Sequence, residues 1–216
     1  MRLQDQPLPT QVTYRQPEKT LKIVLRPFSY FLLYLFIFLT SDVSALSTGD
    51  KIPLITLSTA FGEKILLASY ARKQGKRNLL LFFFRTGTCG VCVGQLQETA
   101  LHHEQIMENN AAVLAISLDD AIIQSQTADK ISRKFPILLD PDSKTAKLFD
   151  VFNPQDKLAK PSIFLIGPDR RILYQHVGKS VYDRPAFAEI LRVVKHYSGL
   201  LPTRDEREVT SGAKAK

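Results

Sequence analysis

Cysteine, histidine and methionine are scarce in this chain, and tryptophan is absent. Its 216 residues include two cysteines, four histidines and two methionines. A structural zinc site needs about four ligands, and no second cysteine pair is present to complete one. A hydrophobic fraction of 44% and a charged fraction of 23% suffice for a full globular core without disulfide bonds. The two cysteines are therefore better explained as reactive groups than as structural ones.

Both cysteines lie in one short segment, Cys89-Gly90-Val91-Cys92. This segment follows an all-apolar run, Leu79 to Phe84, and precedes a helical pattern. A buried strand that leads into a Cys-x-x-Cys and then a helix is typical of a redox pair. Backbone N–H groups at the first helical turn favour a thiolate at Cys89. Cys92 lies on nearly the same helix face, so we predict that Cys89 attacks and Cys92 resolves the mixed disulfide.

An inert core position and a copper site are the alternative roles for the cysteines. Buried free cysteines are often simply part of a core, although the glycine-containing approach argues against that here. Two thiolates also suit Cu(I), which would make the chain a copper-carrying module, but Met1 and Met107 are both remote from the pair. His103 falls on the apolar stripe of the helix after Cys89, so we predict a packed histidine and not a catalytic base.

The first 45 residues have the pattern of an export signal. Residues 1 to 26 are polar with basic residues near their end, Phe28 to Leu39 carries no charge, and Val43-Ser44-Ala45 places small residues at a cleavage site. We predict that residues 1–45 are a signal peptide cleaved after Ala45, or an N-terminal membrane anchor. In both cases the domain is exported to the periplasmic side. A cysteine pair there is oxidised unless something reduces it, which predicts a membrane electron donor.

The net charge of +8 is spread along the chain. Its densest basic cluster comprises Arg72, Lys73, Lys76 and Arg77, in a segment that contains Gly75. We interpret this cluster as a solvated loop in preference to a patch for an anionic partner. No nucleic-acid-binding motif accompanies it.

The pattern of apolar residues predicts an α/β domain over residues 46–200, followed by a polar tail, 201–216. Strands alternate with helices and a C-terminal strand pair precedes a last helix, which indicates a mixed sheet between helices. Asp183 is the expected cap of that last helix. The expected strands are Leu54–Ser58 with Ile65–Leu67 as an N-terminal hairpin, then Leu79–Phe84, Ala111–Ser117, a short strand within Phe135–Asp142, Ser162–Ile166 and Arg171–Val177.

Several of these segments together resemble one superfamily. They are the Gly49–Pro53 opening, Phe84–Leu96, Ile116–Asp119, Phe135–Asp142 and Lys160–Ile166. The chain resembles the thioredoxin superfamily over about Gly49 to Tyr197. Within it, the resemblance is to the redoxin group of peroxiredoxin-like alkyl hydroperoxide reductase/thiol-specific antioxidant proteins and TlpA-like exported thioredoxins. The resemblance implies a thioredoxin-like fold with an N-terminal hairpin extension, a thiol-dependent oxidoreductase, and no cofactor.

The two subfamilies assign the site differently. Compared with TlpA-like proteins, Cys89 matches the nucleophile, Cys92 the resolving cysteine, and Pro161 the proline that is cis in thioredoxins and faces the disulfide. Thr88 stands where those proteins usually have tryptophan. The resemblance then implies a thiol-disulfide oxidoreductase acting on a protein dithiol or disulfide, which is the leading hypothesis.

Compared with peroxiredoxins, whose pattern is Pro-x-x-x-Thr-x-x-Cys, Cys92 matches the peroxidatic cysteine. Cys89 then replaces the threonine and Arg85 the proline. Lys160 lies near the position of the family's active-site arginine. A lysine cannot form the two parallel hydrogen bonds that an arginine guanidinium makes. The alternative hypothesis is a thiol peroxidase in which peroxide oxidises Cys92 to a sulfenic acid and Cys89 condenses with it.

Overall fold

The computed structural model describes residues 45–199. The predicted leader, apart from Ala45, and the predicted tail lie outside these residues, so export and a membrane electron donor stay predictions. Within residues 45–199, no helix combines the length and apolarity that crossing a membrane requires.

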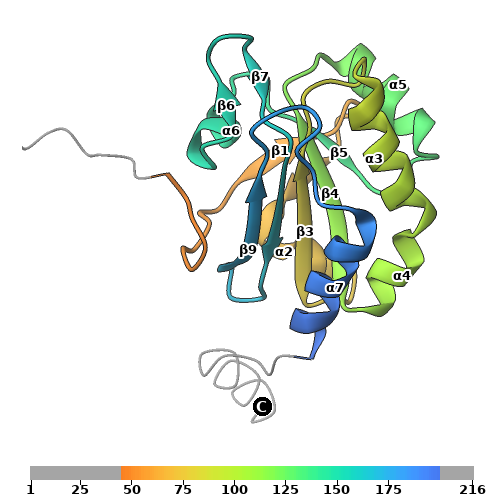
Figure 1. The fold of residues 1–216 in the computed structure, drawn as a ribbon, viewed down its shortest axis with the longest axis vertical. Helices are drawn as coiled ribbons and strands as arrows, with labels where there is room; N and C mark the ends of the chain where they lie inside the picture. The colour runs from red at the N-terminus through yellow and green to blue at the C-terminus, as the bar shows by residue number, and fades with distance from the viewer. Residues whose placement is uncertain (1–44, 200–216) are drawn as a thin grey trace, which may run out of the picture. The chain divides into compact units, whose positions relative to one another are not determined.

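A seven-stranded mixed sheet forms the centre of the domain, in the order β2-β1-β5-β4-β3-β8-β9 (Figure 1). Strands β3, β4 and β5 are parallel, and the remaining pairs are antiparallel. The predicted mixed sheet with an N-terminal hairpin is therefore confirmed. Its strands are β1 (Thr56–Ser58), β2 (Lys64–Leu66), β3 (Asn78–Phe83), β4 (Ala111–Ser117), β5 (Ile137–Leu139), β8 (Ser162–Ile166) and β9 (Ile172–Val177).

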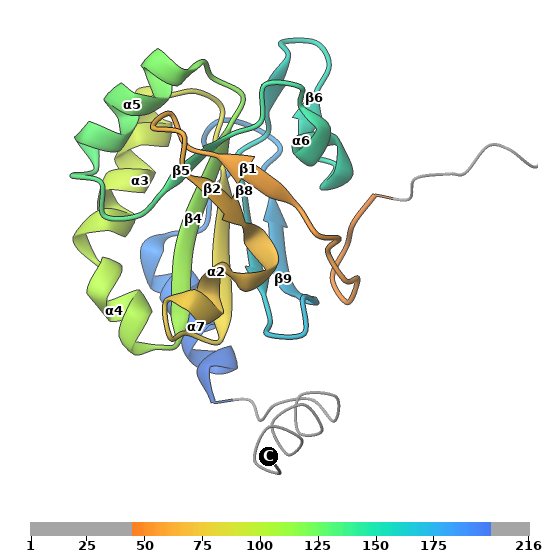
Figure 2. The same ribbon diagram turned by 180° about the vertical axis from the view of Figure 1, so that it is seen from behind.

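Helices cover both faces of the sheet. On one face lie α3 (Gly90–Leu101), α5 (Ala121–Lys130) and α7 (Phe187–Ser198), and on the other lie α2 (Leu67–Lys73) and α6 (Lys144–Leu148) (Figures 1 and 2). The short α4 (His103–Glu108) follows α3 after a break at His102. A two-stranded hairpin of β6 (Phe152–Asn153) and β7 (Leu158–Ala159), not predicted, precedes β8.

Strand β3 shows why the sequence specifies this layering. All six of its residues are buried. Side chains of a strand alternate between faces, so Leu80 and Phe82 pack with α3, α5 and α7 while Leu81 and Phe83 pack with α2 and α6. An unbroken apolar run is what a central strand covered on both sides requires.

Three chain segments meet where β3 ends. Phe83 pairs with Ser162 at the start of β8, and Ser162 pairs with Val177 at the end of β9. Three segments therefore lie together at the end of the sheet where β3 finishes: the loop that carries Cys89, the Lys160–Pro161 segment, and the chain beyond Val177. The two cysteines are held at this end of the sheet.

Two predictions for this end of the sheet were wrong. Asp183 does not cap the last helix, because α7 begins at Phe187 after Ala186 and has no side-chain cap. The Lys160–Pro161 bond is trans, as are all peptide bonds in the described part of the chain. Pro161 therefore does not share the cis conformation of the thioredoxin proline.

Candidate active site

Cys89 directly precedes helix α3. It is the N-cap, with extended backbone angles, and its Sγ accepts a hydrogen bond from the Cys92 N–H at 3.4 Å. The predicted position at the first helical turn is confirmed. Cys89 is partly exposed, whereas Cys92 is buried. Cys89 is thus the cysteine that a large partner can reach.

Cys92 lies one turn into α3, among core residues that include Phe84 and Leu96, and its exposed fraction is 0%. One polar group from a distant segment reaches it. Arg184 donates from Nη2 to Cys92 Sγ at 3.1 Å and from Nη1 to Gln95 Oε1 at 2.6 Å. The guanidinium is therefore fixed between two residues of the same helix, with one arm on the sulfur.

Opposing influences act on the pKa of the Cys92 thiol. Burial raises this pKa above its ordinary value, and the hydrogen bond with the Cys89 side chain raises it further. The charge of Arg184 and the backbone of Arg85 and Thr86 lower it, and the net direction is upward. Arg184 thus supplies the principal charge that favours the thiolate at Cys92.

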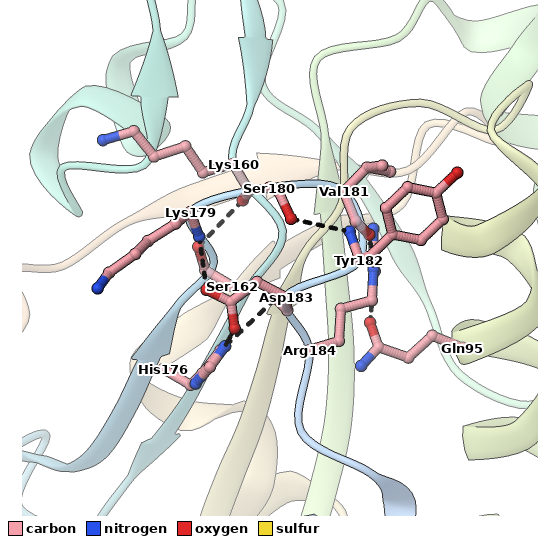
Figure 3. A network of polar contacts seen from close by, with 10 residues as sticks. All are labelled: Gln95, Lys160, Ser162, His176, Lys179, Ser180, Val181, Tyr182, Asp183 and Arg184. Carbon is pink, nitrogen blue, oxygen red and sulfur yellow. Dashed lines mark hydrogen bonds and ion pairs between the residues drawn. The ribbon is translucent and has the colours of Figure 1, made fainter.

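The segment that carries Arg184 is held by polar contacts of its own (Figure 3). Asp183 accepts from the Lys179 N–H at 2.8 Å and pairs with His176 Nε2 at 3.2 Å. The Lys179 N–H is the first cause that lowers the pKa of Asp183, and the charge of His176 contributes. Arg184 Nε donates to the Val181 carbonyl at 2.7 Å. The side chain of Asp183 therefore organises the loop before α7 and not the helix itself.

Gly178 brings this loop against the Lys160–Pro161 segment. Its N–H donates to the Pro161 carbonyl at 2.8 Å. A Cβ at this position would lie 2.5 Å from the Asp183 carbonyl oxygen and 2.7 Å from that of Pro161. Only glycine allows this approach, so the backbone of Pro161 contributes to placing the loop of Arg184.

The remaining supporting residues predicted from the sequence do not contact the cysteine sulfurs through their side chains. Thr88 is exposed, and its Oγ1 lies 3.2 Å from Thr86 Oγ1. Lys160 donates from Nζ to the Asp150 carbonyl at 3.4 Å and points away from Arg184 in Figure 3. Arg85, at the place of the peroxiredoxin proline, pairs with Asp156 of the β6–β7 hairpin at 2.8 Å. The charge next to Cys92 comes from Arg184, which no sequence pattern indicated.

His103 packs against an aromatic ring and belongs to no metal cluster among the described residues. Its ring stacks on Phe135, and burial lowers its pKa, which agrees with the predicted packed histidine. Among residues 45–199, no three histidine, cysteine, aspartate or glutamate side chains converge as metal ligands would.

Gly87 is the residue by which the core holds the loop before Cys89. Its N–H donates to Asp119 Oδ2 at 2.9 Å, and its carbonyl accepts from Lys130 Nζ at 3.0 Å. A Cβ at Gly87 would overlap Thr127 Oγ1. Asp119 and Lys130 thus bind the backbone of residue 87, and Thr127 packs so close that this residue must lack a side chain.

Replacing Gly87 by alanine should lower the free energy of unfolding by about 2 kcal/mol, because the added methyl group forces Thr127 or the loop to move. Urea denaturation of the full chain measures this change. Gly94→Ala is the matched control, since a Cβ there meets open space in α3. That variant should be unchanged or up to about 1 kcal/mol more stable. Equal urea midpoints for Gly87→Ala and the unmodified chain would contradict this role of Gly87.

A mixed sheet whose central strand leads into a cysteine pair at a helix N-terminus, with an arginine on one sulfur, is the architecture of a thiol-dependent oxidoreductase with a thioredoxin-like fold. The model of the AhpC/TSA family matches residues 48–175. The chain therefore belongs to the AhpC/TSA family.

Curated relatives agree with this assignment, and solved structures agree with the fold. Alkyl hydroperoxide reductase E of Mycobacterium tuberculosis is 28% identical over 123 residues, covering 56% of this chain and 78% of the relative. Peroxiredoxin Bcp of Bacillus subtilis is 28% identical over 156 residues, covering 69% and 96%. A cysteine-to-serine mutant of Xylella fastidiosa PrxQ superposes with a TM-score of 0.61 at 25% identity, covering 72% and 99%. Mycobacterium tuberculosis BcpB gives a TM-score of 0.61 at 22% identity, covering 70% and 98%.

Proposed function

We propose that this protein is a thiol peroxidase in which Cys92 is the thiol that peroxide oxidises and Cys89 is the resolving thiol. The observation that carries the proposal is the contact of Arg184 Nη2 with Cys92 Sγ at 3.1 Å. A guanidinium at this distance favours the thiolate and can also donate to a peroxide oxygen. The relatives named as peroxiredoxin and alkyl hydroperoxide reductase support the same chemistry.

The reaction balances with the two thiols, one peroxide and an external dithiol. The Cys92 thiolate attacks one peroxide oxygen, so that an S–O bond forms, the O–O bond breaks, and the leaving oxygen takes a proton to give water or an alcohol. The Cys89 thiolate then attacks the sulfenic sulfur of Cys92, a disulfide forms, and water leaves. A dithiol partner returns both cysteines to thiols by exchange.

The burial of Cys92 adds a step to this sequence. With an exposed fraction of 0%, its sulfur meets peroxide only after the Arg184 side chain or the loop before Cys89 shifts. Both segments lie at the same end of the sheet, and hydrogen bonds contribute to holding them; such contacts near the surface open more readily than core packing. We therefore infer that a local opening precedes the attack on peroxide.

The same burial favours a second function, thiol-disulfide exchange with a protein partner. In that reaction the more exposed Cys89 attacks a partner disulfide, and Cys92 releases the mixed disulfide from within. The order of exposure fits this assignment, which is also the leading hypothesis from the sequence.

Reaction of the reduced chain with one equivalent of hydrogen peroxide distinguishes the two functions. The peroxidase proposal predicts rapid formation of an intramolecular Cys89–Cys92 disulfide, read by mass spectrometry as the loss of two hydrogens. Thiols that persist with peroxide while a model protein disulfide is reduced quickly would instead establish the exchange function. Cys89→Ser and Cys92→Ser serve as controls, since neither can form the disulfide.

A further inference from the structure

A cavity lies at the end of the sheet away from the cysteines. It has a volume of about 740 Å³ and is bounded by α2, by the turn between β8 and β9, and by Leu79 near the start of β3. The cysteine loop follows the opposite end of β3, and the cavity shares no lining residue with the candidate active site. Its volume falls within the range of about 300 to 1,000 Å³ that is usual for small-molecule sites.

The lining of this cavity is strongly basic. Five cationic side chains line it, and Asp169 is its only acidic residue. Asp169 is itself paired with Arg171 at 3.2 Å. Within residues 45–199, none of the five cations takes part in an ion pair. The cations are Lys51, Arg72, Lys76, Arg77 and Arg170. Their combined field attracts an anion.

Arg77 offers the most defined group for that anion. Its backbone N–H donates to the Asn110 carbonyl at 3.1 Å, which fixes its place beside β3. Its Nε is buried and has no hydrogen-bond partner among the described residues. A guanidinium presents adjacent N–H groups that match the two oxygens of a carboxylate or phosphate. Arg77 lines the cavity, so an oxyanion bound there would lie beside a guanidinium whose Nε lacks an acceptor.

The remaining lining is mostly apolar, with Ser69 as its polar side chain. Leu66, Leu67 and Ala68 contribute from the α2 side, and Leu54 lies at the rim with an exposed fraction of 70%. A ligand with an apolar body would remove the Leu54 side chain from water, which favours binding. Free inorganic phosphate would leave this surface uncovered.

We propose that this cavity binds a small organic anion, with its carboxylate or phosphate on Arg77 and its apolar body against Leu54 and α2. The basic cluster noted in the sequence is thus divided in two. Arg72, Lys76 and Arg77 line the cavity, whereas Lys73 does not. Arg72 and Lys73 also lie in the last turn of α2, so the prediction that they belong to a loop was wrong.

Isothermal titration of the full chain with 2-naphthoate tests the proposal. 2-Naphthamide has the same apolar body without the charge, and acetate has the carboxylate without the body. We expect 2-naphthoate to bind at least about tenfold more tightly than either, because only it satisfies both parts of the site. Equal binding of 2-naphthoate and 2-naphthamide would overturn the proposal.

Four variants locate the binding. Arg77→Gln, Arg72→Gln and Leu54→Ser should each weaken 2-naphthoate binding, and the exposed Arg72 and Leu54 can be changed without disturbing the core. Lys73→Gln, which removes the same charge from the same helix outside the cavity, should leave affinity unchanged. Affinity that is unaffected by all of the first three variants would overturn the proposal. Two other results would also overturn it. One is that the chain binds anionic lipid vesicles but not 2-naphthoate, and the other is that it binds 2-naphthoate only after residues 200–216 are deleted.

Discussion

Cys92→Ser should abolish the reaction with peroxide, whereas Cys89→Ser should keep the first oxidation and lose turnover. Serine at position 92 leaves no sulfur beside Arg184, and loss of a nucleophile of this kind lowers rates by about a thousandfold or more. Serine at position 89 leaves Cys92 to be oxidised to a sulfenic acid that has no resolving partner within the chain. Stopped-flow mixing with hydrogen peroxide measures the first step, and peroxide consumption with excess dithiothreitol measures turnover.

A sulfenic acid trap separates these outcomes from a simple loss of folding. In the Cys89→Ser chain, dimedone should label residue 92 after one equivalent of peroxide, and the Cys92→Ser chain should take up none. Both variants should unfold at urea concentrations close to that of the unmodified chain. If dimedone labelled Cys89 in the Cys92→Ser chain as fast as the unmodified chain reacts with peroxide, the roles of the two cysteines would be the reverse of those proposed.

Arg184→Gln is expected to slow the peroxide reaction by about a hundredfold at pH 7, the usual effect of removing one preorganised charged donor. The charge of Arg184 lowers the pKa of Cys92 against the opposing effect of burial. Without that charge the pKa rises further, so less thiolate is present at pH 7. Arg184→Lys keeps the charge but lacks the planar guanidinium that contacts both Cys92 and Gln95. Its rate should lie between those of the unmodified chain and Arg184→Gln.

Removing the charge of Arg184 should shift the pH profile of the peroxide reaction to higher pH. Because the thiolate is the reactive form, the rate of the unmodified chain should rise with pH through the pKa of Cys92. The curve for Arg184→Gln should lie at higher pH, and its deficit should narrow at the alkaline end as both thiols ionise. Arg192→Gln is the control, because Arg192 is an exposed arginine of α7 with no contact to either cysteine. Superimposable curves for Arg184→Gln and the unmodified chain would show that Arg184 does not act on Cys92.

The parts of the fold that follow from local pattern could be predicted from the sequence. Leu79 to Phe84 is an uninterrupted apolar run, and all of it except Phe84 lies in the buried central strand β3. The two cysteines follow this run and are spaced one helical turn from each other. Cys89 is the N-cap of α3. Each of these features depends on neighbours within a few residues. Short-range patterns therefore sufficed to place the cysteines.

Arg184 could not be found in this way. It lies 92 residues from Cys92 in a loop without periodicity, and it reaches the sulfur through the order in which β3, β8 and β9 pair. Asp183 was mistaken for a helix cap because an acidic residue shortly before an apolar stripe usually has that role. Its carboxylate instead accepts from the Lys179 N–H and pairs with His176. Lys160 matched a family position by sequence, but its ammonium group lies at Asp150.

The burial of Cys92 and its contact with Arg184 have opposite consequences for function. Burial slows the arrival of any oxidant, while the guanidinium favours the thiolate that reacts with peroxide. Hydrogen peroxide is small enough to enter after a minor shift of the loop, whereas a protein disulfide reaches only Cys89. The size of the oxidant therefore decides which cysteine reacts first.

The second-order rate constant of the reduced chain with hydrogen peroxide at pH 7 distinguishes a thiol peroxidase from a thiol-disulfide exchange protein. N-acetylcysteine under the same conditions is the reference for an unassisted thiol. We expect a rate constant at least about a hundredfold above that reference, lost in Cys92→Ser and strongly reduced in Arg184→Gln. A rate constant equal to that of N-acetylcysteine, with rapid attack of Cys89 on a model disulfide, would contradict the peroxidase function and establish thiol-disulfide exchange in its place.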